Sequence, residues 1–145
     1  MTAAIRIRPL HLSDYEAMAD LFRICGIGPQ SRGRDSRAAI ARQLRSKRNW
    51  YLGAFDGDRL VGTVLGTHDT RKGWIKRLAV HPDHRRRGIA SRLVRECERG
   101  LRKEGIQMFA AIIEKGNRPS ERVFRRLGYR LGPVTYARRK LRPGI

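Results

Sequence analysis

The chain has 145 residues, 40% of them apolar, which is enough for one domain (residues 1–145) with a single core. It has no apolar run near the roughly 18–20 residues of a membrane span, no signal-peptide core at its N-terminus and only two cysteines, without metal-ligand or disulfide spacing, so we expect a cytoplasmic protein with reduced thiols. The 33 Lys and Arg residues against 13 Asp and Glu give a net charge of +20, which either attracts polyanions or reflects an arginine-rich proteome.

The first third of the chain predicts a short strand and two helices. Ile5–Arg8 alternates isoleucine and arginine, as a strand does. Ser13 followed by Glu16 is typical of a capping box, and the helix that follows should end at Gly26. A second helix is expected over Ser36–Ser46 after a polar loop.

Three antiparallel strands are expected next. Trp50–Phe55 and Arg59–Thr67 are apolar runs, and the Asp56-Gly57 pair between them favours a hairpin turn. After a second turn, Trp74–Val80 predicts the third strand.

The C-terminal half predicts a long amphipathic helix, a buried central strand, a short helix and one or two last strands. Gly105 is a natural stop for the long helix, and Asn117 with Pro119 is typical of the start of the short one. The expected segments are Gly88–Glu104, Met108–Ile113, Asn117–Gly128, Tyr129–Leu131 and Val134–Lys140.

The polar stretch between Val80 and Gly88 is a candidate anion site. The first N–H groups of a helix have no partner inside it, and the helix dipole adds partial positive charge there. Gly88 lacks the Cβ that would keep an anion away from the backbone, and Ala90 keeps the next turn slim. The pattern therefore predicts a phosphate or pyrophosphate site.

The same stretch resembles the GCN5-related N-acetyltransferase (GNAT) family. Arg85–Ala90 reads RRRGIA and fits that family's acetyl-CoA signature, Arg/Gln-x-x-Gly-x-Gly/Ala. The preceding Leu78–His84 and the later stretch from Asn117 to Tyr129 are also similar to the family. The resemblance covers nearly the whole chain from about Ile5. It implies an α/β fold with a central mixed sheet, antiparallel N-terminal strands, a splayed parallel pair in the middle and helices on both faces.

The resemblance also implies that acetyl-CoA binds as co-substrate in the gap between the parallel strands. Backbone N–H groups from Arg86 to Ser91 would hold the pyrophosphate, and the pantetheine arm would lie along the strand that ends at Val80. Asn117 is alternatively a helix cap, while Arg126 and at least one of the three consecutive arginines are alternatively solvated. The residues expected to bind acetyl-CoA are Leu78, Ala79, Val80, Arg85, Arg86, Arg87, Gly88, Ile89, Ala90, Ser91, Asn117, Phe124 and Arg126.

The implied reaction is direct attack of a primary amine on the acetyl thioester. The N–H of Val80 would polarise the thioester carbonyl. Many family members protonate the leaving thiolate with a tyrosine, which Phe124 replaces here. A thiol with a pKa of about 8.5 leaves without full protonation, and Tyr129 and Tyr136 are alternative acids.

Glu114, at the end of the expected central strand, is the first candidate for the general base, and Asp69 is the second. The alternative for Glu114 is an ion pair with a neighbouring cation, and that for Asp69 is a turn-forming role. His81 and His84 have suitable chemistry, but the resemblance places them in a connecting loop. We expect no metal, because no ligand cluster has the required spacing.

Lys76 and Arg77 are basic where many relatives carry acidic residues. We therefore expect a small neutral or acidic amine, amino acid, peptide or protein amine as acceptor. Two alternatives remain: a non-catalytic module that binds acetyl-CoA, and a nucleic-acid-associated protein that uses Arg138–Arg142. We expect nucleic acid to bind only through non-specific contacts. The C-terminal segment is either a homodimer contact or a solvated end.

Overall fold

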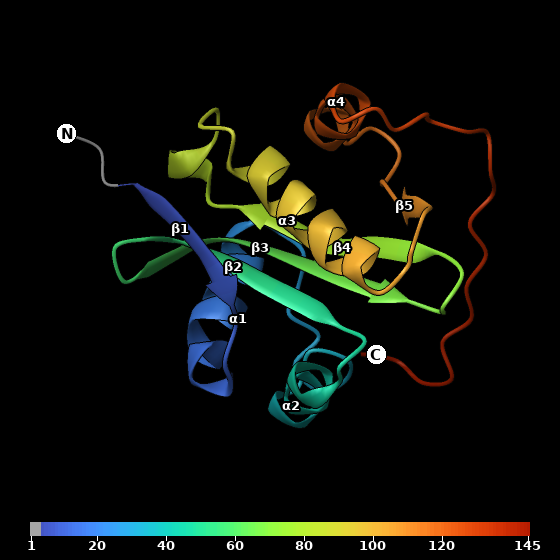
Figure 1. Cartoon of the computed structure of the whole chain (residues 1–145). Helices are drawn as coiled ribbons and strands as arrows, with labels where there is room; N and C mark the ends of the chain where they lie inside the picture. The colour runs from blue at the N-terminus through green and yellow to red at the C-terminus, as the bar shows by residue number, and fades with distance from the viewer. Residues whose placement is uncertain (1–3) are drawn as a thin grey trace.

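A five-stranded mixed sheet lies between two pairs of helices in the computed structural model, which describes residues 4–145 (Figure 1). The strands follow one another across the sheet in chain order. They are β1 (Ile5–Pro9), β2 (Trp50–Asp56), β3 (Arg59–His68), β4 (Gly73–Val80) and β5 (Phe109–Ala111). The helices are the 3-10 turns η1 (Leu12–Asp14) and η2 (Pro82–His84) and the α-helices α1 (Tyr15–Ile24), α2 (Arg37–Arg45), α3 (Ile89–Lys103) and α4 (Arg118–Arg126).

The pairing of the strands confirms the expected mixed sheet. β1 to β4 pair antiparallel with their neighbours, whereas β4 and β5 pair parallel. The β2–β3 hairpin turns at Gly57, whose φ of 60° lies in the left-handed region. The parallel pairing is short, because only Gly73–Ile75 of β4 lies opposite β5.

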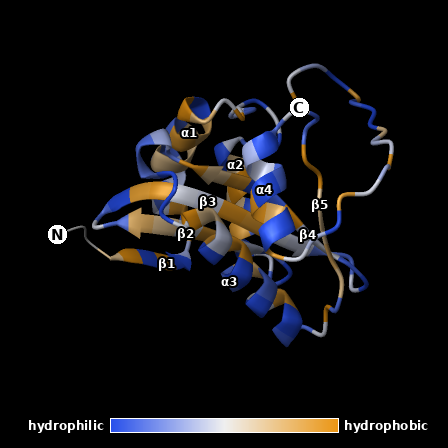
Figure 2. Ribbon diagram, turned by 90° about the horizontal axis from the view of Figure 1, so that it is seen from above, coloured by the Kyte–Doolittle hydropathy of each residue, from blue (hydrophilic) through white to orange (hydrophobic). Residues whose placement is uncertain are grey.

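Alternating strand residues fill two apolar layers. On one face α1 and α2 cover the sheet, and Tyr51 and Phe55 point toward them. On the other face α3 packs on Leu52 and Ala54, the intervening residues of the same strand. Figure 2 shows many residues of β2 and β3 in hydrophobic colours and many hydrophilic residues on α3 and α4. No helix within residues 4–145 combines the length and apolar character needed to cross a membrane.

The long helix is confirmed almost to the residue. α3 runs over Ile89–Lys103, with Gly88 as its N-cap and Glu104 as its C-cap. Gly88 has a φ of 73° and Gly105 a φ of 87°, so each end of the helix needs a residue that adopts the left-handed region at low cost.

The expected capping box at Ser13 is wrong. Ser13 lies inside η1, and Asp14 is the N-cap of α1. The Asp14 carboxylate instead accepts the N–H of His11 and a hydrogen bond from Arg8 (2.9 Å). A hydrogen bond from a cation to a carboxylate is stronger than one to a neutral serine hydroxyl. The turn therefore forms around Asp14 rather than around Ser13.

The expectations for the last part of the sheet are also wrong. β5 spans only three residues and lies at the sheet edge, half-buried, rather than as a buried central strand. Among the described residues no strand follows Ala111, so the strands expected over Tyr129–Leu131 and Val134–Lys140 do not form.

The C-terminal segment, residues 132–145, is instead extended and largely exposed. Gly132 and Pro133 interrupt it, because glycine disfavours a fixed strand and proline lacks an N–H to donate. Figure 1 shows the segment passing the β5 side of the sheet and returning toward α2. There the side chain of Arg142 donates to the carbonyl of Arg32 (3.1 Å).

Candidate functional site

A bulge bends β4 where it leaves β5. Thr63 pairs with Ala79 and Leu65 with Lys76, so two residues of β4, Arg77 and Leu78, lie opposite the single residue between Thr63 and Leu65. Arg77 has a φ of 52°, and its carbonyl accepts a hydrogen bond from the Thr63 hydroxyl (2.9 Å). A bulge bends and twists its strand. This one begins two residues after Ile75, the last β4 residue that pairs with β5, and the two strands do not pair beyond that point.

The backbone of Val80 faces away from β3. The N–H of His81 donates to the carbonyl of Val61 on β3 (2.8 Å). Because alternate residues of a strand turn their backbone groups to opposite sides, Val80 turns its N–H and carbonyl toward the side where β4 and β5 separate. Its carbonyl accepts from Arg85 Nε (3.1 Å) and lies 3.5 Å from Cys25 Sγ.

The arginines between Val80 and α3 have different partners. Arg85 holds the Val80 carbonyl. Arg87 Nη1 lies 3.5 Å from the Asp56 carboxylate and 2.8 Å from the ring of His84. Arg86 is exposed and has a φ of 65°. Their charges surround the start of α3.

The two histidines shape the connecting loop. His81 is buried, and its Nδ1 accepts the N–H of Asp83 (3.1 Å) as the N-cap of η2. Its Nε2 lies 3.2 Å from Arg59. His84 lies beside Asp56 and Arg87. These contacts give both rings a structural role, as the resemblance implied.

The N-terminus of α3 offers its backbone to an anion. Gly88 is the N-cap, no side chain caps the helix, and a Cβ at Gly88 would meet no atom within 4 Å. Ile89 is 2% exposed, so it can offer only its backbone N–H. Ala90 and Ser91 are half-buried. A 15-residue helix with an uncovered first turn fits a pyrophosphate.

One apolar cluster joins the strand end to the later motif. It contains Ile89 and Phe124, with Leu78 and Val80 packed against it. Asn117 is the N-cap of α4, and its side chain accepts the N–H of Ser120 (3.3 Å). Arg126 is exposed in the last turn of α4. The structure thus brings the predicted motifs to neighbouring elements.

Phe124 is buried and holds the ring of Tyr129 edge-on, with the ring centroids 4.9 Å apart. The Tyr129 hydroxyl donates to the Glu98 carboxylate. Burial, followed by this acceptor, raises the pKa of Tyr129 above its usual range. A tyrosine with a raised pKa is a poor proton donor. The contacts of Tyr129 with Phe124 and Glu98 indicate a structural role.

Tyr129→Phe should therefore lower stability without slowing acetyl transfer. We expect a loss of about 1–3 kcal/mol, since a carboxylate loses a hydrogen-bond donor, and a kcat within a factor of two of the parent. Urea unfolding and steady-state kinetics measure the two effects. A general acid would instead cost about 10²–10⁴-fold in rate, and a loss of that size would make Tyr129 the acid.

The two candidate bases lie in different places. Glu114 is exposed, beyond the end of β5, and its backbone carbonyl accepts the N–H of Asn117 (3.0 Å). Asp69 lies in the β3–β4 turn, at the opposite end of β4 from Val80. Its carboxylate accepts the N–H groups of Lys72 (2.8 Å) and Arg71 (3.0 Å), which lower its pKa. Asp69 is therefore a turn former, whereas the role of Glu114 stays a prediction.

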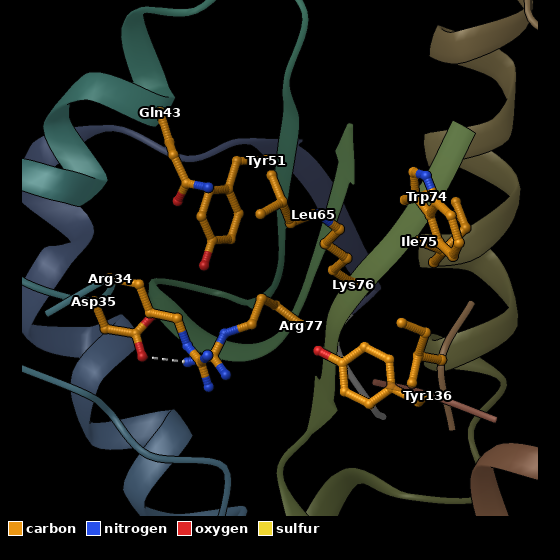
Figure 3. Close-up of a pocket in the computed structure, with 11 residues that line it drawn as sticks. Arg34, Asp35, Gln43, Tyr51, Leu65, Trp74, Ile75, Lys76, Arg77 and Tyr136 are labelled. Carbon is orange, nitrogen blue, oxygen red and sulfur yellow. Dashed lines mark hydrogen bonds and ion pairs between the residues drawn. The ribbon is translucent and has the colours of Figure 1, made fainter. Parts of the chain in front are cut away.

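A cavity of about 380 Å³ opens beside the bulged strand (Figure 3). Its wall is formed by β2, β3, β4, the residue after β5, α2, the loop before α2 and the C-terminal segment. Its charged residues are Arg34, Asp35, Lys76 and Arg77. Tyr136, one of the predicted alternative acids, also lines the cavity although its side chain is largely exposed.

Arg77 connects β4 to the segment between α1 and α2 at the wall of this cavity. Its Nη2 donates to the Asp35 carboxylate (2.9 Å) and its Nη1 to the carbonyl of Ile27 (3.0 Å). The guanidinium also lies over the ring of Phe22, 4.3 Å from its centroid. Sequence reasoning singled out Arg77 but missed Asp35 and Tyr51. The one signal for Tyr51 was a hydroxyl within an otherwise apolar strand. Among residues 4–145, no three His, Cys, Asp or Glu side chains gather as metal ligands would.

Comparison with known proteins identifies the family. The sequence model of the acetyltransferase (GNAT) family matches residues 15–129. An acetyltransferase of Photorhabdus laumondii is 30% identical over 113 residues, which are 78% of this chain and 78% of that protein. An acetyltransferase of Pectobacterium atrosepticum is 29% identical over 126 residues, which are 86% of this chain and 87% of that protein.

Solved structures share the fold at lower identity. PaiA N-acetyltransferase of Thermoplasma acidophilum in complex with coenzyme A has a TM-score of 0.80 at 21% identity, covering 91% of this chain and 93% of that one. The aminoglycoside acetyltransferase AAC(6')-Iy, in complex with a bisubstrate analogue, has a TM-score of 0.79 at 18% identity, covering 95% and 99%. With the bulged strand and the open helix start, these matches lead to one conclusion: the chain belongs to the GNAT family and is an acetyl-CoA-dependent N-acetyltransferase.

Proposed function

We propose that the enzyme transfers the acetyl group of acetyl-CoA to a primary amine that is neutral or carries an acidic group. The observation that carries this proposal is the separation of β4 from β5 beside a cavity whose charged residues are three cations and one carboxylate. Asp35, the carboxylate, is already paired with Arg77. An acceptor with several positive charges would therefore be repelled, whereas an acidic or neutral one would not.

The cofactor contacts follow from the backbone. The pyrophosphate would accept hydrogen bonds from the N–H groups of residues 86–91, with charge from Arg85 and its neighbours. The pantetheine arm would extend along residues 78–80, as an added strand does. The N–H of Val80, turned away from β3, would then polarise the thioester carbonyl. Asn117, Phe124 and Arg126 remain predicted contacts from α4.

The reaction itself needs little help in expelling the thiolate. The amine nitrogen attacks the thioester carbon, the C–S bond breaks, and the sulfur leaves with the bonding pair as the CoA thiolate. The attacking amine must lose a proton, and Glu114 is our candidate to accept it. Phe124 has no proton to give, but a leaving group with a pKa of about 8.5 can depart as the anion.

Thermal melting with acetyl-CoA at two salt concentrations, followed by an amine panel, tests the proposal. A ligand at 100 times its Kd stabilises the folded state by about 2.7 kcal/mol, so we expect a saturable rise in Tm that persists at high salt. The panel should favour amino acids and small neutral amines over spermidine and aminoglycosides. Transfer RNA is the control for non-specific charge, and its effect should vanish at high salt. A best substrate among the polycations would overturn the acceptor class.

A further inference from the structure

Two buried hydrogen-bond donors of the cavity have no acceptor within the described part of the chain. The Tyr51 side chain, 4% exposed, projects from β2, and its oxygen lies close enough to the Arg77 guanidinium to interact with it, but its O–H has no acceptor. Arg77 uses both terminal nitrogens, but its Nε is also buried without a partner. Figure 3 shows the Tyr51 hydroxyl turned toward the guanidinium groups of Arg34 and Arg77. Buried polar groups without partners are rare in native proteins, and each calls for an explanation.

We infer that Tyr51 and Arg77 bind an oxyanion, a carboxylate or a phosphate, on the acceptor amine, and so select the substrate. This inference rests on the proposed function, because it assigns the cavity to the acceptor. Two converging donors suit one oxyanion, and hydrogen bonds to a charged oxygen are stronger than those to a neutral one. Arg77 and Tyr51 are thus specificity-determining residues.

The charges around the pair favour an anion over a neutral acceptor. Asp35 is the carboxylate of the cavity wall, and it already accepts from Arg77 Nη2 (2.9 Å) and from the N–H of Gln30 (2.8 Å). Arg34 and Lys76 add two further cations to the same wall. Desolvation lowers the pKa of Lys76, so a nearby anion would also restore favourable interactions for its charge.

The position of the pair limits the length of the acceptor. Arg77 lies three residues before Val80 on β4, and three residues span at most about 10 Å in an extended strand, a span that the bulge at Arg77 shortens. The reacting amine and its oxyanion should therefore be separated by about that distance or less. A cavity of about 380 Å³ admits a small molecule. The substrate class is thus a small amino carboxylate, a dipeptide or an amino phosphate.

Tyr51→Phe tests the inference because it removes one oxygen and leaves the ring. We expect its KM for 6-aminohexanoate to rise at least tenfold and its KM for the matched neutral 6-aminohexanamide to change less than twofold. O-phosphoethanolamine and ethanolamine form the second pair. The pair in which the anionic amine is more strongly preferred over its neutral match shows whether the site binds a carboxylate or a phosphate. The KM for acetyl-CoA should be unchanged.

Tyr15→Phe is the matched control. The Tyr15 hydroxyl already donates to the backbone carbonyl of Asp35 (2.9 Å), and Tyr15 does not line the cavity. Its loss should lower Tm and leave the preference for anionic amines intact. Tyr51→Phe should instead keep or raise Tm, since the O–H that it removes has no acceptor in the fold.

A binding readout separates this inference from the proposed function. The rise in Tm caused by 6-aminohexanoate or O-phosphoethanolamine alone should be lost in Tyr51→Phe, while the rise caused by acetyl-CoA stays. If acetyl-CoA binds but neither anionic amine is preferred over its neutral match, the inference is wrong and the proposed function stands. If Tyr51→Phe lowers Tm and leaves selectivity unchanged, the donors serve a structural water, which also overturns the inference. If acetyl-CoA causes no rise, the proposed function fails, and the Tm arm with the amines alone still decides whether the pair binds an anion.

Discussion

Gly88→Val is expected to weaken acetyl-CoA binding at least a hundredfold, which corresponds to roughly 2.8 kcal/mol. Gly88 adopts a φ of 73° as the N-cap of α3. A β-branched residue disfavours that conformation, and its side chain would stand where an anion must approach the first N–H groups of the helix. Isothermal titration with acetyl-CoA measures the effect directly.

Gly105→Val provides the control at the other end of the same helix. Gly105 has a φ of 87°, and a Cβ there also meets no atom within 4 Å. Both variants should therefore lose a similar amount of folding stability, on the order of 1–2 kcal/mol from the left-handed backbone. Only Gly88→Val should lose the ligand. Equal affinity of the two variants for acetyl-CoA would mean that the pyrophosphate binds elsewhere.

Arg77→Met should destabilise the fold by about 3–5 kcal/mol, because it leaves a buried carboxylate without its cation. The Asp35 side chain is 6% exposed and that of Arg77 is 18% exposed, and their nitrogen and oxygen atoms are 2.9 Å apart. The substitution also removes the hydrogen bond to the Ile27 carbonyl. Since whole domains are stable by only about 5–15 kcal/mol, the loss should be plain in a urea titration.

A second ion pair of the same length is the comparison. Arg23 and Asp20 lie 2.9 Å apart on the surface, with side chains 65% and 67% exposed. Arg23→Met should cost at most about 0.5 kcal/mol, because water already solvates both charges. Adding Asp35→Asn to Arg77→Met should recover part of the stability, since no unpaired charge then remains. Similar losses for Arg77→Met and Arg23→Met would show that Asp35 has access to water or another cation.

Local patterns in the sequence predicted the elements whose signals are local. The apolar stripe and the flanking glycines located α3, and two apolar runs on either side of the Asp56-Gly57 turn located β2 and β3. The predicted anion site rested on the expected helix start together with Gly88 and Ala90, which lie within a few consecutive residues.

The remaining features depend on contacts between distant residues. Arg77 and Asp35 are 42 residues apart in sequence, and nothing in the sequence near either residue indicates which charged residue it pairs with. The bulge in β4 likewise has no signature, since Arg77 adopts a positive φ without being glycine. The strand expected over Val134–Lys140 needed a pairing partner that the local sequence does not reveal; no such pairing forms, and Val134 is 88% exposed. Tyr51 became a candidate only when the fold placed its hydroxyl in the cavity.

The C-terminal segment forms part of the cavity wall without pairing as a strand. Tyr136 reaches the cavity from this segment, and Arg142 fastens it to the loop that carries Arg34. The predicted acetyl-CoA contacts lie on β4, the loop after it, α3 and α4, outside this segment. Exchanging residues 132–145 is therefore expected to change the lining of the cavity at Tyr136 while the sheet, α3 and α4 keep their packing.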